Sequence, residues 1–257
     1  MSQLLEVRQL GVAIGGRMVC EQLDLVIEAG QSWALLGRNG TGKTTLLHHL
    51  AGLRREHSGA IFLGADNLAH LAPRTRARQI GILLQHSSQG LGASVLETVL
   101  TGRHPHLSTL AWEAASDLVI ANRCIAAMDL EDLAGRPLDT LSGGELRRVE
   151  IARLLAQQSR LSLFDEPMNH LDLAYQARCL RVLGEQCVNA ERAMLLVVHD
   201  LNLAYRACDH WLILKGGGGW HAGRRDELCD PTLLSHAYGH PIARFDSDDG
   251  PLFLPRL

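Results

Sequence analysis

The chain has 257 residues, of which 46% are hydrophobic, and a net charge of −3 from 25 basic and 28 acidic side chains. This composition excludes a disordered chain, and the lack of excess positive charge argues against nucleic acid as the main partner. No apolar run reaches the length of roughly 18 to 20 residues that a membrane-spanning helix needs.

The amino terminus and the cysteines predict a cytosolic protein. Residues 1–6 lack the basic start and the apolar stretch of a secretory signal. The six cysteines are scattered and form no C-x-x-C pair, so we expect reduced, buried thiols rather than disulfides or a zinc site. They are Cys20, Cys124, Cys179, Cys187, Cys208 and Cys229.

The first 30 residues predict an antiparallel β subdomain. Leu23–Ile27 is strand-like, and Gly15 and Gly16 suit a two-residue hairpin turn because glycine tolerates positive φ. Four later apolar segments, separated by helical patterns, are typical of parallel strands buried on both faces. These segments are Trp33–Leu36, Ile80–Leu84, Leu161–Phe164 and Met194–Val198. The sequence therefore predicts an α/β fold with a mainly parallel core sheet.

A helical subdomain is expected to interrupt this core. Residues 87–158 have mainly helical composition, which leaves 1–86 and 159–257 for the α/β core. The whole chain would then be one domain with an inserted helical lobe.

Two later segments are interpreted as structural. A stripe at spacings of three and four predicts the core-facing side of an amphipathic helix, formed by Leu173, Ala177, Leu180, Gly184 and Cys187. The four glycines at 216–219 predict a turn between late strands, because no Lys-Ser or Lys-Thr follows them.

Residues 37–44 match the phosphate-binding pattern G-x-x-x-x-G-K-[ST]. They follow an apolar strand and open a helix with Leu46, Leu47 and Leu50 on its apolar side. In such a loop, backbone N–H groups converge on phosphate oxygens, the lysine adds a charge, and the last hydroxyl reaches magnesium. The expected nucleotide-binding residues here are Gly37, Arg38, Asn39, Gly40, Thr41, Gly42, Lys43, Thr44 and Thr45.

An acidic pair ends the apolar strand 161–164. Asp165 is expected to face the metal and Glu166 to activate the attacking water, which predicts hydrolysis rather than binding alone. Such a pair can also be a solvated strand edge or a helix cap. The phosphate-binding loop at residues 37–44 (the P-loop) favours the catalytic interpretation.

A second glycine-containing loop precedes another helix. Its residues are Leu141, Ser142, Gly143, Gly144 and Glu145, and the helix carries Leu146, Val149, Ala152 and Leu155. Small residues there expose backbone N–H groups and the positive end of the helix dipole to an anion. This loop is therefore a candidate second phosphate-binding element.

The order of these segments resembles the ATP-binding cassette (ABC) family of P-loop ATPases. In that family the pentapeptide at 141–145 is the signature loop, which closes on the nucleotide held by a second copy of the domain. The resemblance therefore implies a head-to-tail homodimer with ATP between the subunits.

The resemblance also implies roles for single residues. Gln85 stands at the place of the Q-loop glutamine, His199 at that of the switch histidine, and Asp172 at that of the D-loop aspartate. Asp172 can equally cap the following helix. The implied catalytic residues are Lys43, Glu166 and His199, and the implied magnesium ligands are Thr44, Gln85 and Asp165.

Some positions depart from the family pattern. Ile14 stands where an aromatic residue commonly stacks on adenine, so the expected contact with the base is aliphatic. Arg147 replaces a frequent glutamine, Met168 a usual threonine, and Ser162 interrupts the strand before Asp165. None of these changes removes a charge or hydroxyl that the chemistry requires.

A narrower resemblance concerns two segments, 101–107 and 199–204, which look like those of ATPases from bacterial importers for ferric siderophores, haem and cobalamin. It implies two membrane-embedded permease subunits, an external binding protein, and a place on the cytoplasmic side of the membrane. A soluble ABC ATPase of iron–sulfur cluster assembly is the main alternative, and the ATPase of an exporter is a third. His104 and His106 suit a loop better than a metal site, because further ligands are lacking nearby.

Overall fold

The computed structural model describes residues 2–85, 92–108, 112–169, 171–248 and 250–256. Its amino-terminal part is the predicted antiparallel subdomain, a sheet with the strand order β2-β1-β4-β5. Its hairpin turn lies at Gly15 and Gly16, which both have positive φ. The strands are β1 (Gln3–Ile14), β2 (Arg17–Glu28), β4 (His57–Leu63) and β5 (Asp66–Asn67).

The central sheet has the strand order β10-β9-β3-β8-β7-β6, and all its pairings are parallel except that of β10 with β9. The four predicted apolar segments form neighbouring strands, and β9 joins them along the other edge of β3. The strands are β3 (Ser32–Gly37), β6 (Ile80–Leu83), β7 (Leu161–Asp165), β8 (Ala193–Val197), β9 (His210–Gly216) and β10 (Gly219–Arg224). The glycine-rich segment turns the chain between the last two, as predicted.

Both faces of this sheet are buried. Successive side chains of a strand point to opposite faces, so each strand contributes to two cores. In β3, Trp33 and Leu35 pack into a core shared with the antiparallel sheet and the first helix. Ala34 and Leu36 pack into a second core, shared with the helices of the opposite face. The uninterrupted apolar pattern of the strand thus serves two cores at once.

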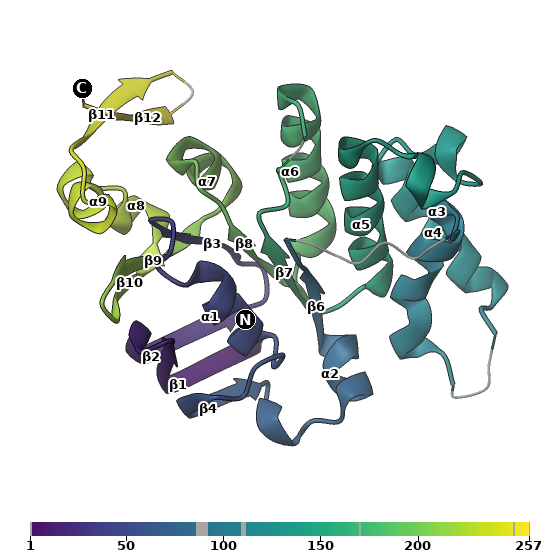
Figure 1. Ribbon diagram of the computed structural model, residues 1–257, viewed down its shortest axis with the longest axis horizontal. Coiled ribbons are helices and arrows are strands. Elements are labelled where there is room, and N and C mark those ends of the chain that lie inside the picture. Colours follow the sequence, from purple (N-terminus) through teal and green to yellow (C-terminus); the bar gives the residue numbers. More distant parts are fainter. Residues whose placement is uncertain (1, 86–91, 109–111, 170, 249, 257) are drawn as a thin grey trace.

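Between residues 92 and 158 the described residues contain helices and no strand. Figure 1 shows these helices gathered at one side of the molecule. They are α3 (Val95–Leu100), η2 (Thr101–His106), α4 (Ala115–Ala127), η3 (Glu131–Leu133), η4 (Leu138–Thr140) and α5 (Gly143–Gln157). Residues 87–91 and 109–111 of the expected lobe lie outside the described residues. The α/β fold class with an inserted helical part is confirmed.

The other helices cover the central sheet and its ends (Figure 1). They are α1 (Lys43–Leu50), η1 (Leu68–His70), α2 (Pro73–Gln79), α6 (Leu173–Cys187), α7 (Leu201–Ala207), α8 (Arg225–Leu228) and α9 (Pro231–Tyr238). A separate hairpin of β11 (Ile242–Ser247) and β12 (Gly250–Pro255) follows α9. In the described part of the chain, none of the helices combines the length and apolarity required to cross a membrane.

The prediction of which side of α6 faces the core was wrong. Leu173 is 84% exposed, and the helix buries Cys179, Val182, Leu183 and Cys187 instead. Only Cys187 belongs to both sets. Leu173 is the first residue of the helix, directly after its cap Asp172, so it lies beyond the end of the packed face.

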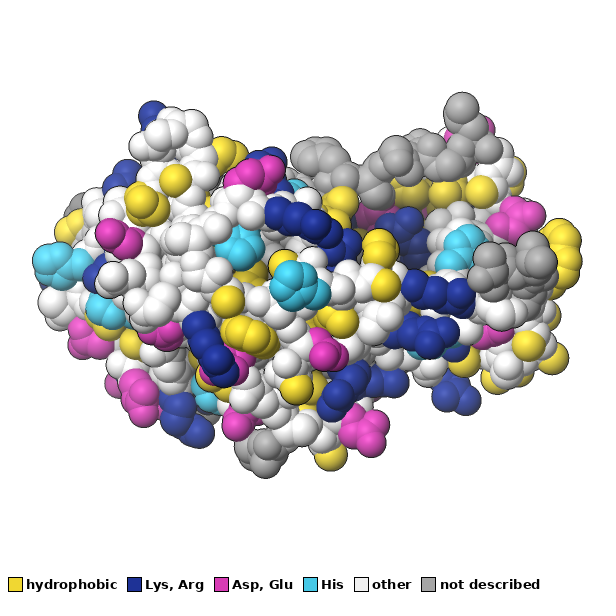
Figure 2. All heavy atoms as spheres, turned by 90° about the horizontal axis from the view of Figure 1, so that it is seen from below, with side chains coloured by type: hydrophobic (Ala, Val, Ile, Leu, Met, Phe, Trp, Pro, Cys, Tyr) yellow, Lys and Arg dark blue, Asp and Glu magenta, His cyan; other side chains and the backbone are white. Residues whose placement is uncertain are grey.

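The prediction of free, buried thiols is confirmed. All six cysteines are free and buried, and burial raises the pKa of Cys20 and Cys124 to about 11. On the face shown in Figure 2, several Lys and Arg side chains gather near the centre and right of the view, with acidic side chains around them.

Candidate functional site

The loop from Gly37 to Gly42 connects β3 to α1 and requires glycine at two positions. Gly37 has φ +140°, and a Cβ there would lie 2.5 Å from the carbonyl oxygen of Leu214. Gly42 has φ +94°, and its Cβ would lie 2.6 Å from a methyl group of Val19. Any larger residue would therefore displace the loop from the packed core beneath it.

Lys43 lies across the inside of this loop. Its Nζ donates to the carbonyl oxygens of Gly37 at 2.8 Å and Arg38 at 3.1 Å. Burial lowers the pKa of the Lys43 ammonium, and the nearby Glu166 and Asp165 partly oppose that shift. Arg38, Asn39 and Gly40 are exposed at the tip, and the other predicted loop residues, Thr41, Thr44 and Thr45, are half-buried.

Asp165 brings the end of β7 to the first turn of α1. Its Oδ1 accepts a hydrogen bond of 3.1 Å from the Thr44 hydroxyl, although the two residues are 121 positions apart. Its Oδ2 is buried without a hydrogen-bond partner among the described residues. Burial raises the pKa of Asp165. A carboxylate oxygen without a partner beside a hydroxyl is a donor set that fits a magnesium ion.

Glu166 is surrounded by three polar side chains. Its Oε1 lies 2.5 Å from Nε2 of His199, and its Oε2 accepts from Asn169 at 2.6 Å and from Gln85 at 3.3 Å. Glu166 also has a φ of +50°, which is uncommon for a residue with a side chain. The structure therefore gathers the ends of β6, β7 and β8 around one carboxylate.

The signature-like loop caps α5. The Ser142 N–H and hydroxyl both donate to Oε2 of Glu145 at 2.7 Å, and the Glu145 N–H donates back to the Ser142 hydroxyl at 3.3 Å. Ser142 and Gly143 are exposed, while Leu141, Gly144 and Glu145 are half-buried. Figure 1 shows α5 in the helical part, well separated from α1. The two candidate phosphate-binding loops thus lie on different parts of the same chain.

Comparison with known proteins decides the family. The model of the ABC transporter family matches residues 20–169, a range that runs from β2 past the acidic pair. The chain belongs to the ABC transporter family.

Relatives within the ABC family extend over nearly the whole chain. The hemin import ATP-binding protein of Myxococcus xanthus is 37% identical over 98% of this chain and 96% of its own length. The iron(3+)-hydroxamate import ATP-binding protein of Bacillus subtilis is 34% identical over 91% of this chain and 87% of its own length. Like other members of the family, this chain is an ATP-binding domain and an ATPase.

Solved structures support the same fold. An ABC transporter of metal-chelate type, in an inward-facing conformation, aligns with a TM-score of 0.84 and 27% identity. The match covers 100% of this chain and 98% of that one. An ATP-binding subunit of another ABC transporter has a TM-score of 0.77 and 26% identity, over 91% and 94% of the two chains.

The remaining residues predicted from the ABC resemblance lie around this cluster or apart from it. Asp172 accepts from the Tyr175 N–H at 2.9 Å, so it caps α6, as the structural alternative predicts. Ile14 ends β1 and is 43% exposed. Its exposed aliphatic side chain is available for a contact to a base.

His104 and His106 lie in η2. The ring of His106 contacts the Gln157 carbonyl oxygen at 2.8 Å, and His104 lies 3.8 Å from Glu113. Within the described ranges, no three His, Cys, Asp or Glu side chains are grouped to hold a metal ion.

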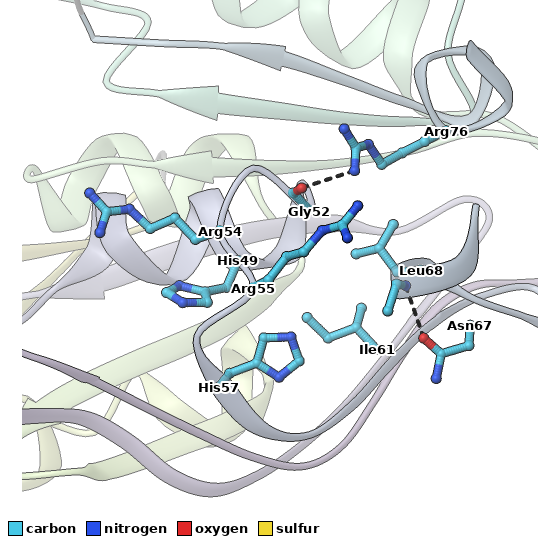
Figure 3. A pocket seen from close by; sticks show the side chains of 10 residues that line it. His49, Gly52, Arg54, Arg55, His57, Ile61, Asn67, Leu68 and Arg76 are labelled. Atoms are coloured by element: carbon cyan, nitrogen blue, oxygen red, sulfur yellow. Dashed lines mark hydrogen bonds between the residues drawn. The ribbon is translucent and has the colours of Figure 1, made fainter. Parts of the chain in front are cut away.

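One cavity adjoins the site, and a second lies apart from it. One of about 210 Å³ adjoins Glu166, Asn169 and His199. Another, of about 100 Å³, lies behind the carboxyl end of α1, where Arg55 and Arg76 approach Leu68 (Figure 3). Arg76 donates to the Gly52 carbonyl oxygen there at 2.9 Å, which stabilises the helix end. None of the predicted site residues lines this second cavity.

Sequence reasoning missed two residues that contact the site. Asn169 has no role in the sequence-based prediction, although its position three residues after Glu166 suggests a local contact. Arg147 departs from the family pattern, and the sequence predicts no role for it. No sequence pattern points to the groups that Arg147 contacts.

Proposed function

We propose that this chain is the ATP-hydrolysing subunit of a bacterial importer. It works as a homodimer with two integral membrane permease subunits, on the cytoplasmic side of the membrane, and an external binding protein delivers the substrate. Relatives named as import ATP-binding proteins, which match nearly end to end, support this proposal. The cargo is a ferric siderophore, haem, cobalamin or a similar substrate, because relatives are named as import ATP-binding proteins for hemin, iron(3+)-hydroxamate and cobalamin.

The observation that carries the proposed chemistry is the pairing of two acids at the end of β7. Asp165 bonds to the hydroxyl of Thr44 in the P-loop, while Glu166 is held by Gln85, Asn169 and His199. One carboxylate therefore faces the phosphate loop, and the next faces a polar group of side chains suited to an attacking water.

In the proposed mechanism, backbone N–H groups of the P-loop and Lys43 bind the phosphates of ATP. Magnesium would be held by Thr44, Asp165 and Gln85, and it would neutralise charge on the phosphate oxygens. Glu166 accepts a proton from the attacking water, and His199 orients Glu166 and contacts the γ-phosphate. The fixed hydrogen bonds around Glu166 keep its carboxylate ready in one position.

The signature loop completes the site in trans. Leu141 to Glu145 of one subunit meet the ATP bound by the P-loop of its partner, and Asp172 lies at the same interface. Residues 87–158 form the helical lobe that transmits closure to the permease, while 1–86 and 159–257 form the nucleotide-binding core. ATP stabilises the closed dimer and hydrolysis reopens it.

Reconstitution tests this function. The chain is co-expressed and co-purified with an importer permease of the same organism and incorporated into liposomes, with the binding protein and a ferric chelate, haem or cobalamin supplied on the outer side. We expect substrate uptake that requires ATP inside the liposomes and that is lost with Glu166→Gln. An active ATPase that binds no permease, and co-purifies with sulfur-transfer proteins instead, would contradict import.

A further inference from the structure

Arg147 is a buried charge that belongs to neither the P-loop nor the signature pentapeptide. It lies on α5 in the helical part, and 5% of its surface is exposed. A buried guanidinium is costly unless its N–H groups are bonded, so its partners matter.

The partners of Arg147 lie almost entirely in the core. Its Nη2 donates to the main-chain carbonyl oxygens of Asp165 at 2.8 Å and Glu166 at 3.0 Å. Its Nη1 donates to the carbonyl oxygen of Leu84 at 2.9 Å, and its Nε lies 3.4 Å from that of Pro167. One side chain of the helical part thus holds the main chain at the ends of both β6 and β7.

The charge of Arg147 is balanced within its own helix. Nη1 also donates to Oε2 of Glu150 at 2.9 Å, one turn further along α5. Glu150 is buried as well. Because the arginine is neutralised locally, its effect on the core comes mainly from its hydrogen bonds to carbonyl groups.

These carbonyl groups belong to residues that matter for the proposed chemistry. Glu166 has the uncommon φ of +50°, and its carbonyl oxygen is one of the acceptors. Leu84 directly precedes Gln85, whose amide donates to the Glu166 carboxylate. Holding these two backbone positions therefore fixes where the Glu166 carboxylate and the Gln85 amide can lie.

We propose that Arg147 is a positioning residue for hydrolysis: it locks the main chain at Glu166 and Leu84 and so aims the Glu166 carboxylate. The inference rests on the catalytic role proposed for Glu166. Arginine suits this task because its planar guanidinium carries five N–H donors, whereas glutamine offers two. Arginine instead of the frequent glutamine at position 147 thus provides more N–H donors at a place where several carbonyl groups converge.

The test uses the full chain with Arg147→Gln, and Arg148→Gln as a matched control. Arg148 is the adjacent buried arginine, and it donates to the carbonyl oxygens of Met128 and Asp129 rather than to the end of β7. We expect Arg147→Gln to lower kcat about 10- to 100-fold, the range for a small misplacement of a reacting group, while the Kd for ATP stays within about threefold. Arg148→Gln should change both by less than about threefold.

A double-mutant cycle separates positioning from general packing. In the Glu166→Gln background, Arg147→Gln should lower single-turnover hydrolysis by less than about twofold, because its effect runs through the carboxylate. Arg147→Lys should give an intermediate kcat. If Arg147→Gln does not fold, the same double-mutant cycle is measured with Arg147→Lys. The inference is overturned if Arg147→Gln costs the same factor in both backgrounds or weakens ATP binding in parallel. Wild-type turnover in Glu166→Gln alone would instead refute the role of Glu166.

Discussion

Two adjacent carboxylates at the end of β7 have different surroundings. Asp165 is fully buried and faces Thr44, while Glu166 accepts hydrogen bonds from amide groups and lies against His199. The positive φ of Glu166 turns the chain sharply at this step, so neighbouring residues serve opposite sides of the strand end. Pairs of acids in distinct environments commonly divide catalytic duties.

Glu166→Gln removes the proposed general base while keeping the shape of the side chain. We expect steady-state phosphate release to fall about 10²- to 10⁴-fold, the range for loss of general base catalysis, with ATP affinity unchanged. Turnover is measured with purified protein, ATP and magnesium, and affinity by titration. Glu185→Gln, an exposed acid on α6, serves as the control. Near-normal turnover in Glu166→Gln would remove this residue from its role.

In the absence of ligands, the ionised carboxylate of Asp165 is expected to lower the free energy of unfolding. Burial raises its pKa, so the ionised form that exists at neutral pH is disfavoured in the folded state. This cost is absent below the unfolded pKa of about 3.9, grows as the pH rises toward the folded pKa, and is fully present above it. Asp165→Asn should therefore raise the free energy of unfolding at pH 7 by about 1 kcal/mol and abolish hydrolysis.

Asp209 serves as a control, because its ionised form is expected to stabilise the fold, whereas that of Asp165 destabilises it. Burial opposes its ionisation, but hydrogen bonds from His210 and Ser32 outweigh burial and lower its pKa. Its ionised form therefore stabilises the fold above the unfolded pKa, and this contribution is lost as the pH falls through the folded pKa. Thermal unfolding without magnesium should show Asp209→Asn less stable than wild type at pH 7. A lower Tm for Asp165→Asn as well would contradict the argument.

At the level of elements, α3 and α5 begin with the same device. Ser94 and Glu97 form a capping box on α3, just as Ser142 and Glu145 do on α5. Each box satisfies N–H groups that a helix start otherwise leaves without partners. Two equivalent caps, only one of them in the signature loop, allow stability to be separated from function.

Ser142→Arg is expected to cut hydrolysis while each monomer still binds ATP, because the long side chain blocks the loop that meets the partner's nucleotide. Ser94→Arg should cost a similar amount of stability, about 1 kcal/mol for a lost cap, and leave turnover largely unchanged. Both variants are compared by thermal unfolding, ATP titration and phosphate release. Retained activity in Ser142→Arg, or equal loss in both, would argue against a signature role for this loop.

Elements with a local pattern could be predicted, and contacts between elements could not. The P-loop, the hairpin at Gly15 and the central strands follow from spacing, glycine and apolar runs. The buried face of α6 was predicted wrongly because period alone does not say which side meets the core or where packing ends. The contacts of Arg147 join main-chain groups up to 63 positions away, and carbonyl acceptors have no sequence signature.

For the whole molecule, the sequence indicated two lobes, and Arg147 shows one way in which they are connected. The central sheet separates two cores, and the core that includes the helical part reaches β3 through Ala34 and Leu36. The same strand ends in the P-loop. A movement of α5 is therefore expected to act on the nucleotide loops through packed side chains and the Arg147 hydrogen bonds, rather than through a flexible linker.

If each ATP site is shared between two chains, mixing two inactive variants should restore some activity. A site formed within one chain would not recover in this way. Lys43→Ala disables the P-loop and Ser142→Arg disables the signature loop, so each homodimer contains two defective sites. A mixed dimer contains one site with both defects and one site that joins an intact P-loop to an intact signature loop. With random mixing, half of the dimers are mixed, so roughly a quarter of all sites should be intact.

Single-turnover hydrolysis measures this recovery. The two variants are purified separately, combined at equal concentration, and compared with each variant alone and with wild type. We expect little product from either variant and a clear gain on mixing, up to roughly a quarter of the wild-type amplitude. Combining Lys43→Ala with Glu166→Gln is the matched control. Both changes lie on the same half of a site, so every site in every dimer keeps a defect. Equal gains in both mixtures, or none in the first, would contradict ATP sites shared between two chains.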